Sequence, residues 1–174
     1  YGIPLQPLPQ PTVPQTIEID RVLIGAVLPI PTGTPAITDN VGRAASVGAR
    51  LAEGLIGRDS GSSEPSLQVL LASSPSADAA ARAAQRLVAT EGVSALIGGF
   101  GTDQAQALSE VAEARGVLFF NIGSPADVLR GEACRTHTFH VEASAAMYLD
   151  VLAGWFTQSG HRRWFFVYEA TDEG

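Results

Sequence analysis

The sequence contains no lysine, and all 11 of its basic residues are arginine. This absence excludes the lysine of a nucleotide-binding P-loop, Schiff-base chemistry and a Ser/Lys catalytic dyad. The one cysteine, Cys134, cannot form a disulfide within the chain. The sequence also lacks GxSxG, HExxH and CxxC motifs. It therefore offers no known catalytic or zinc-binding motif.

Positive charge is also scarce: the formal net charge is -7, and the sequence contains no run of basic residues. A nucleic-acid partner or an anionic membrane surface is therefore not expected. No apolar run approaches the roughly 20 residues that cross a bilayer. The 174 residues, 45% of them hydrophobic, suffice for one well-buried domain.

The first 16 residues are rich in proline, at positions 4, 7, 9, 11 and 14. Proline fixes φ and removes backbone donors, so residues 1–16 are expected to form an extended arm, with a disordered end as the alternative. Residues 17–174 are then expected to form one α/β unit.

From residue 21 onward, short runs of Val, Ile, Leu and Phe alternate with alanine-rich helical patterns. This alternation is typical of βαβ units, and it predicts a three-layer α/β fold with a doubly wound, mostly parallel sheet of flavodoxin-like or Rossmann-like order 2-1-3-4-5. The predicted strands are Arg21–Leu28, Ser66–Ala72, Ser94–Gly98, Val117–Asn121 and Arg163–Tyr168. A short extended piece, Thr136–Val141, lies in the long connection after the fourth strand.

Helix boundaries are marked by Ser74 and Ser144 as N-caps and by glycines at expected helix ends. Those glycines are Gly57, Gly92, Gly116 and Gly160. Two apolar stripes at helical spacing are predicted to pack in the core. They comprise Ala105, Leu108, Val111 and Ala112, and then Met147, Tyr148, Val151, Leu152, Trp155 and Phe156.

Three loops should meet at the carboxyl ends of the strands, where open parallel sheets bind ligands. They are residues 29–40, 98–103 and 121–127. Glycines in the second loop let a ligand approach the main chain, and the following helix start favours an anion. The hydroxyls of Thr102 and Ser124 would complete the site. The alternative is a tight turn that Thr102 merely caps.

No cofactor or metal is expected. A dinucleotide fingerprint belongs after the first strand, whereas the glycine loop follows the third strand and reads GxGxxQ. His137 and His140 have no carboxylate or cysteine at metal-ligand spacing, so structural hydrogen bonds are the preferred role.

Five motifs occur in an order that resembles the amino-terminal lobe of type I periplasmic binding proteins, in the Leu/Ile/Val-binding branch of ABC-importer receptors. They are IGAVLPIPTG, VGARLAEGL, RAAQRLVATEGVSALIGGFGT, EARGVLFFNIGSPADVLRG and RRWFFVYEATDEG. Within that branch, GEACRTHTFHVEASAAMYLDVLAGWF and RRWFFVYE resemble receptor-type proteins associated with pyrroloquinoline-quinone-dependent alcohol oxidation.

The resemblance implies a non-enzymatic, periplasmic or extracytoplasmic receptor that captures a small carboxylate-bearing ligand, such as a branched-chain amino acid or an organic acid. An ABC permease would be its membrane partner. The implied ligand-binding residues are Phe100, Gly101, Thr102, Ile122, Gly123 and Ser124. Residues 34–40 would face the ligand side chain. An aromatic residue expected just beyond the fifth strand is replaced by residues 169–172, EATD, which puts amino-acid specificity in doubt.

The resemblance also implies a carboxyl-terminal lobe that the sequence does not contain, so we expect a piece of a longer protein that binds ligand weakly alone. Two other functions stay open at this point. One is the sensor lobe of a signalling receptor or regulator. The other is a flavodoxin-like or nucleotide-binding enzyme, which the missing lysine and first-strand glycines disfavour.

Overall fold

The computed structural model describes residues 21–30, 40–59 and 66–167. The predicted arm, most of the loop 29–40, and residues 169–172 lie outside these ranges. Within them, five strands form one parallel sheet of order β2-β1-β3-β4-β5. The strands are β1 (Arg21–Leu28), β2 (Ser66–Ser73), β3 (Ala95–Gly98), β4 (Leu118–Asn121) and β5 (Thr138–His140). This topology confirms the predicted fold class and sheet order.

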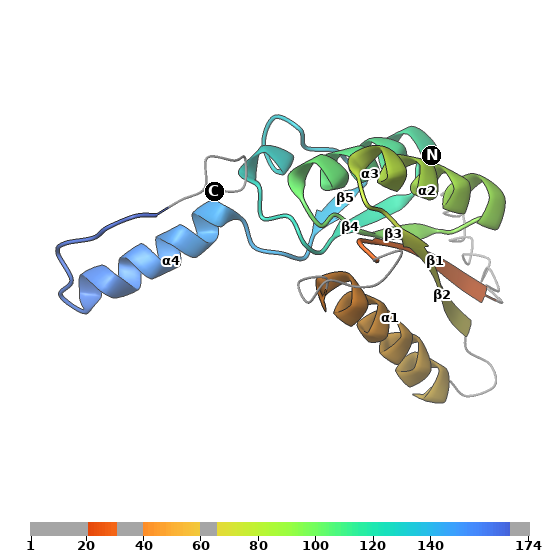
Figure 1. The fold of residues 1–174 in the computed structure, drawn as a ribbon, viewed down its shortest axis with the longest axis horizontal. Helices are drawn as coiled ribbons and strands as arrows, with labels where there is room; N and C mark the ends of the chain where they lie inside the picture. The colour runs from red at the N-terminus through yellow and green to blue at the C-terminus, as the bar shows by residue number, and fades with distance from the viewer. Residues whose placement is uncertain (1–20, 31–39, 60–65, 168–174) are drawn as a thin grey trace, which may run out of the picture.

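Helices cover both faces of the sheet, so the fold has three layers with the sheet in the middle (Figure 1). On one face lies α1 (Asn40–Asp59), and on the other lie α2 (Ala77–Arg86) and α3 (Thr102–Arg115). A single π turn, η1 (Leu87–Glu91), extends α2, and a short 3-10 turn, η2 (Asp127–Leu129), follows β4.

Alternation along β1 divides the core between the two faces of the sheet. Val27 belongs to the cluster shared with α2 and α3, whereas Ala26 and Leu28 belong to the cluster covered by α1. The predicted stripe of α3 is buried in full, with Leu108 and Ala112 completely inaccessible. These contacts hold the sheet and α3 as a rigid support for the loops at the carboxyl edge.

The observed helix caps correct two sequence predictions. Ser76 caps α2 by accepting a hydrogen bond from the Ala79 N–H at 3.3 Å. Ser74 lies two residues before this cap, and its hydroxyl donates to the Gln104 Oε1 instead. Gly57 does not end α1, which runs on to Asp59. The other predicted boundaries, Ser144, Gly92, Gly116 and Gly160, are confirmed.

The predicted strand Arg163–Tyr168 is wrong over its described part, because residues 163–167 form no strand. The edge beside β4 is taken by β5, which lies inside the extended piece predicted at Thr136–Val141. The connection from β4 to β5 is short enough for this pairing, and residues 163–167 lie beyond α4 in the chain. Residues 161–167 lie instead next to α4 (Ala145–Gln158), away from the sheet (Figure 1).

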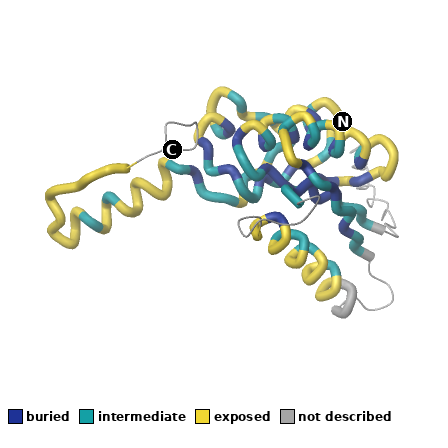
Figure 2. Tube along the Cα trace, in the orientation of Figure 1, coloured by how far each residue is buried: buried dark blue, intermediate teal, exposed yellow. Residues whose placement is uncertain are grey.

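The predicted core role of the second apolar stripe is also wrong, because α4 has no buried residue. Met147, Val151 and Trp155 are exposed, and the helix projects from the sheet body (Figure 2). The helix begins four residues after Val141 without crossing back over the sheet. Its first turn is anchored to the loop after β4, since the N–H of Ala145 donates to the Pro125 carbonyl at 2.9 Å.

Candidate ligand-binding site

Two of the three predicted loops meet at the carboxyl edge of the sheet. The N–H of Ile122 donates to the Gly98 carbonyl at 2.9 Å, so the loop after β4 lies directly against the loop after β3. In the register of the sheet, Gly98 is paired with Asn121, the last residue of β4. The loops after neighbouring strands therefore converge where ligands bind in open parallel sheets.

Glycine at positions 98, 99 and 123 is required by the protein's own packing. A Cβ on Gly98 would lie 2.4 Å from the Val27 carbonyl oxygen, and one on Gly123 would lie 2.7 Å from the Phe100 ring. Gly99 has a φ of 90°, and its Cβ would lie 2.8 Å from the Asn121 side-chain oxygen. At these positions the tight-turn explanation holds, because neighbouring protein groups occupy the space.

Gly101 meets a different requirement, because it is the residue from which α3 starts. Its φ of 102° is one that residues with a Cβ rarely adopt. The N-cap residue of α3 is Gly101, which has no side chain to cap the first turn, and Thr102 is the first residue of the helix. The alternative role of Thr102 as a cap is therefore wrong.

The predicted hydroxyl pair lies together in the structure. The Thr102 Oγ1 and the Ser124 Oγ are 3.4 Å apart, and both residues are buried. The four other predicted site residues lie in the same two loops, around this pair. Phe100 is half-buried against the core on the α1 side of the sheet and covers the Gly123 backbone. The site combines two hydroxyls with the positive end of a 14-residue helix.

Asn121, which was not among the predicted site residues, organises the loop after β4. Its side chain is completely buried, and its Nδ2 donates to the Ser124 carbonyl at 2.8 Å. Its Oδ1 accepts from the Ser124 N–H at 3.0 Å and from the Gly123 N–H at 3.3 Å. The signal in the sequence is a polar amide that ends an apolar strand at the ligand edge, where burial requires full hydrogen bonding.

Two serines at the end of β2, which were not predicted to lie at the site, link that strand to the same edge. The Ser74 hydroxyl donates to the Gln104 Oε1 at 3.1 Å, which links β2 to the first turns of α3. The Ser73 hydroxyl donates to the Ile30 carbonyl at 2.6 Å. These bonds fix the start of α3 relative to the end of β1.

The hydrogen-bond network of the site includes an ionisable side chain, His140. Its Nδ1 lies 3.0 Å from the Asn121 Nδ2. Burial lowers the pKa of His140 from its ordinary value of 6.5, and the nearby Arg130 cation lowers it further, while the Leu129 carbonyl raises it. The imidazole beside the site is therefore neutral at pH 7.

The described residues contain no group of three or more His, Cys, Asp or Glu side chains that is arranged to hold a metal ion. His137 is paired with Glu113 instead, with 2.9 Å between Nδ1 and Oε2. That hydrogen bond is the main reason why the pKa of Glu113 is lowered. Both histidines of the THTFH segment thus make hydrogen bonds to side chains.

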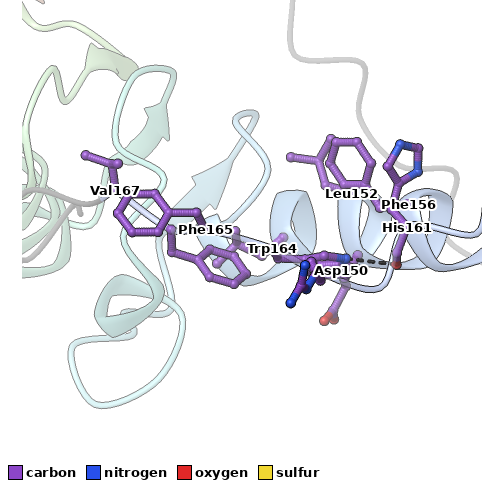
Figure 3. A pocket seen from close by; sticks show the side chains of 11 residues that line it. Asp150, Leu152, Phe156, His161, Trp164, Phe165 and Val167 are labelled. Carbon is purple, nitrogen blue, oxygen red and sulfur yellow. Dashed lines mark hydrogen bonds between the residues drawn. The ribbon is translucent and has the colours of Figure 1, made fainter.

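A hollow of about 580 Å³ lies elsewhere, between α4 and residues 161–167. Its lining is mainly apolar and aromatic, with Leu152, Phe156 and Phe165 among the labelled side chains (Figure 3). Phe165 is 91% exposed, so this surface is an open face of α4 and not an enclosed cavity. It contains none of the residues predicted to bind ligand.

A doubly wound parallel sheet with loops that converge at its carboxyl edge is the architecture in which open α/β folds bind their ligands. The sequence matches the periplasmic binding protein family over residues 22–174, so the chain belongs to that family. This is a family of binding proteins, in agreement with the prediction that the protein is not an enzyme. A comparison with curated protein sequences gives no significant match.

Solved structures share the fold at low sequence identity. A periplasmic binding protein from Burkholderia mallei has 23% identity and a TM-score of 0.67, over 81% of this chain and 36% of that chain. A leucine-, isoleucine-, valine-, threonine- and alanine-binding protein from Brucella ovis has 22% identity and a TM-score of 0.68, over 80% and 37%. An ABC transporter solute-binding protein from R. palustris in complex with benzoate has 19% identity and a TM-score of 0.64, over 80% and 38%.

The chain therefore spans well under half the length of these relatives. No described helix combines the length and the hydropathy that a membrane span requires.

Proposed function

We propose that this chain is the amino-terminal lobe of an extracytoplasmic solute-binding receptor of an ABC importer. Its ligand is a small molecule with a carboxylate, held between this lobe and a carboxyl-terminal lobe. The observation that carries the proposal is the pair of buried hydroxyls, Thr102 and Ser124, at 3.4 Å beside the start of α3.

The carboxylate is the group that suits this arrangement. A hydrogen bond to a charged group contributes about 1.5–3 kcal/mol, whereas the helix dipole alone contributes about 0.3–1 kcal/mol. The Thr102 and Ser124 hydroxyls are the proposed donors, and Phe100, Gly101, Ile122 and Gly123 border them. The N–H groups of Ile122 and Gly123 already donate to the Gly98 carbonyl and to the Asn121 Oδ1. Two structural relatives support this class, because the amino acids bound by one and the benzoate bound by the other all carry a carboxylate.

The second lobe is needed because a small-molecule pocket buries about 70–90% of its ligand, which one open edge cannot do. The exposed face of α4 and residues 161–167 supports a second lobe, since an apolar surface of this kind is normally covered. We propose that residues 17–174 supply the first lobe and that this face of α4 contacts the carboxyl-terminal one. Closure of the two lobes over the ligand creates the form that a membrane permease recognises.

A narrower proposal concerns the branch of the family. Residues 131–156 and 162–169 resemble receptor-type proteins associated with pyrroloquinoline-quinone-dependent alcohol oxidation. On this proposal the ligands include small acids formed by oxidation of alcohols, and amino acids bind less well. The EATD sequence at residues 169–172, where amino-acid receptors of the family commonly have an aromatic residue, also supports weaker binding of amino acids.

The test begins with a thermal-shift screen of the full-length receptor against leucine, valine, benzoate, acetate and propionate. Isothermal calorimetry then measures the best ligand with Thr102→Val, which removes a hydroxyl and preserves shape. Loss of one hydrogen bond to a carboxylate predicts a rise in Kd of roughly 10-fold to 100-fold.

The matched control is Thr90→Val, because Thr90 is an exposed threonine on η1. The control should leave Kd within a factor of two, on the order of 0.4 kcal/mol. An unchanged Kd in Thr102→Val, with the fold intact, would remove Thr102 from the site. The absence of a thermal shift with all five of these carboxylates would contradict the proposed ligand class.

A further inference from the structure

Asn121 and His140 are register partners at the last paired position of β4 and β5. Their side chains meet at this edge, with the Asn121 Nδ2 at 3.0 Å from the His140 Nδ1. Asn121 also holds three main-chain groups of the loop that carries Ser124. One buried amide thus connects an imidazole to the proposed ligand loop.

The direction of each hydrogen bond follows from the chemistry of the amide. The Gly123 and Ser124 N–H groups both point to one end of the Asn121 side chain, so that end is the oxygen. The other end is then the NH₂ group, which can only donate. It donates to the Ser124 carbonyl and to the His140 Nδ1, so that nitrogen carries no hydrogen. Neutral His140 therefore has its hydrogen on Nε2.

We propose that His140 is a positioning residue that fixes the loop 122–124 through Asn121, and that protonation of His140 releases this loop. The consequence for ligand affinity rests on the function proposed above. The release of the loop on protonation of His140 does not depend on that function.

Protonation places a hydrogen on Nδ1, which then faces the NH₂ group of Asn121. Rotating the amide by 180° satisfies that hydrogen, but it turns the NH₂ group toward the N–H groups of Gly123 and Ser124 and the oxygen toward the Ser124 carbonyl. One contact is gained and three are lost, so the flipped state does not hold the loop. The Ser124 hydroxyl then loses its fixed position beside Thr102.

Partial burial of the ring is the main cause that favours neutral His140, because a partly buried imidazolium is poorly solvated. The guanidinium of Arg130 adds to this effect by opposing a second positive charge on the imidazole. Arg130 is itself held in place, since its Nη2 donates to the Glu142 carbonyl. The other histidine of the segment, His137, is paired with Glu113. Among the described residues, it makes no hydrogen bond to Asn121 or to the loop 122–124.

The pH dependence has a definite sign. His140 has a pKa below the 6.5 of an unperturbed imidazole, so the unfolded chain binds a proton more readily than the folded chain. The stabilisation from the neutral pair is complete above pH 6.5 and is lost as pH falls through the folded pKa. The ligand loop should therefore be fixed at neutral pH and released in acid.

The test is a pH titration of the full-length receptor by nuclear magnetic resonance, with ¹⁵N-labelled histidine and backbone. At pH 7.5 the His140 ring should show hydrogen on Nε2 and none on Nδ1. The backbone amides of Gly123 and Ser124 should then shift with the same midpoint as His140, at a pH below 6.5. This readout needs no ligand, so it stands or falls separately from the proposed solute-receptor function.

Three variants separate positioning from simple packing. His140→Asn offers an acceptor near the position of Nδ1 and does not titrate, so the Gly123 and Ser124 signals should stay native-like and lose their acid shift. His140→Gln places its amide nearer the position of Nε2, so those signals should be displaced at every pH. The control His137→Asn, in the same segment, should leave the titration of the loop amides unchanged.

Hydrogen on Nδ1 of His140 at pH 7.5 would overturn the proposal. So would loop amides whose midpoint differs from that of His140, or an acid shift that persists in His140→Asn. If His140→Asn does not fold, the wild-type tautomer and the matched midpoints still decide the question.

Discussion

Replacement of Asn121 by alanine tests whether the loop after β4 is held by this one amide. The side chain is fully buried and makes four hydrogen bonds, to the Gly123 N–H, to the Ser124 N–H and carbonyl, and to the His140 Nδ1. Each buried polar group left without a partner costs about 1–3 kcal/mol. Water entering the vacated space compensates part of this cost, so the lower bound of about 1 kcal/mol per group applies, or about 4 kcal/mol in all.

A loss of about 4 kcal/mol is a large part of the 5–15 kcal/mol that typically stabilises a domain. Urea denaturation of the full-length receptor at pH 7.5 measures it as a change in the free energy of unfolding. The control is Gln106→Ala, because Gln106 is an exposed residue of α3 whose side chain hydrogen-bonds only to Glu110 among the described residues. The control should cost less than about 0.5 kcal/mol. A loss below about 1 kcal/mol in Asn121→Ala would refute the reasoning.

Three further predictions concern the fold, its acid sensitivity and the division into lobes. Gly98→Ala should destabilise by at least about 2 kcal/mol in urea, because its Cβ would lie 2.4 Å from the Val27 carbonyl, and a smaller loss would argue against this packing. The pKa of Glu53 is lowered mainly by its hydrogen bond from Arg50 and also by the Val69 N–H, so its stabilisation is present above pH 4.5 and is lost as pH falls. Glu53→Gln should therefore flatten the acid limb of the stability profile, and an unchanged profile would contradict that assignment. Calorimetry should show that the 174-residue chain alone binds the best ligand at least about 10-fold more weakly than the full-length receptor, and equal affinity would contradict the need for a second lobe.

The sheet could be predicted because strands and helices have different periods. The near-continuous apolar runs at residues 21–28 and 66–72 are typical of strands buried on both faces, and both are strands in the structure. The stripe of α3 was readable for the same reason, since its spacing matches a buried helix face.

The exposure of α4 could not be predicted from the sequence. An apolar stripe predicts that a helix face is buried, but it does not show which surface covers that face. The residues of α4 have the pattern of a core helix, and the described chain provides no layer for them to pack against. The same reasoning explains the misplaced fifth strand. Residues 163–167 have strand composition, yet β5 already occupies the edge beside β4.

Part of the candidate site was within reach of the sequence. The glycine loop and the hydroxyls of Thr102 and Ser124 follow from the rule that ligands bind beyond the carboxyl ends of parallel strands. The hydrogen bond between Asn121 and His140 could not be predicted from the sequence, because the two residues are 19 positions apart and their contact depends on β5 pairing with β4. The use of Gly98 and Gly99 for packing was likewise invisible, since spacing does not show what a missing Cβ leaves room for.

The most direct test of the account is a crystal structure of the full-length receptor with the tightest ligand from the screen. The account predicts a ligand carboxylate oxygen within about 3 Å of the Thr102 hydroxyl and of the Ser124 hydroxyl. A ligand bound away from the loops after β3 and β4, with Thr102 and Ser124 making no contact to it, would contradict the account.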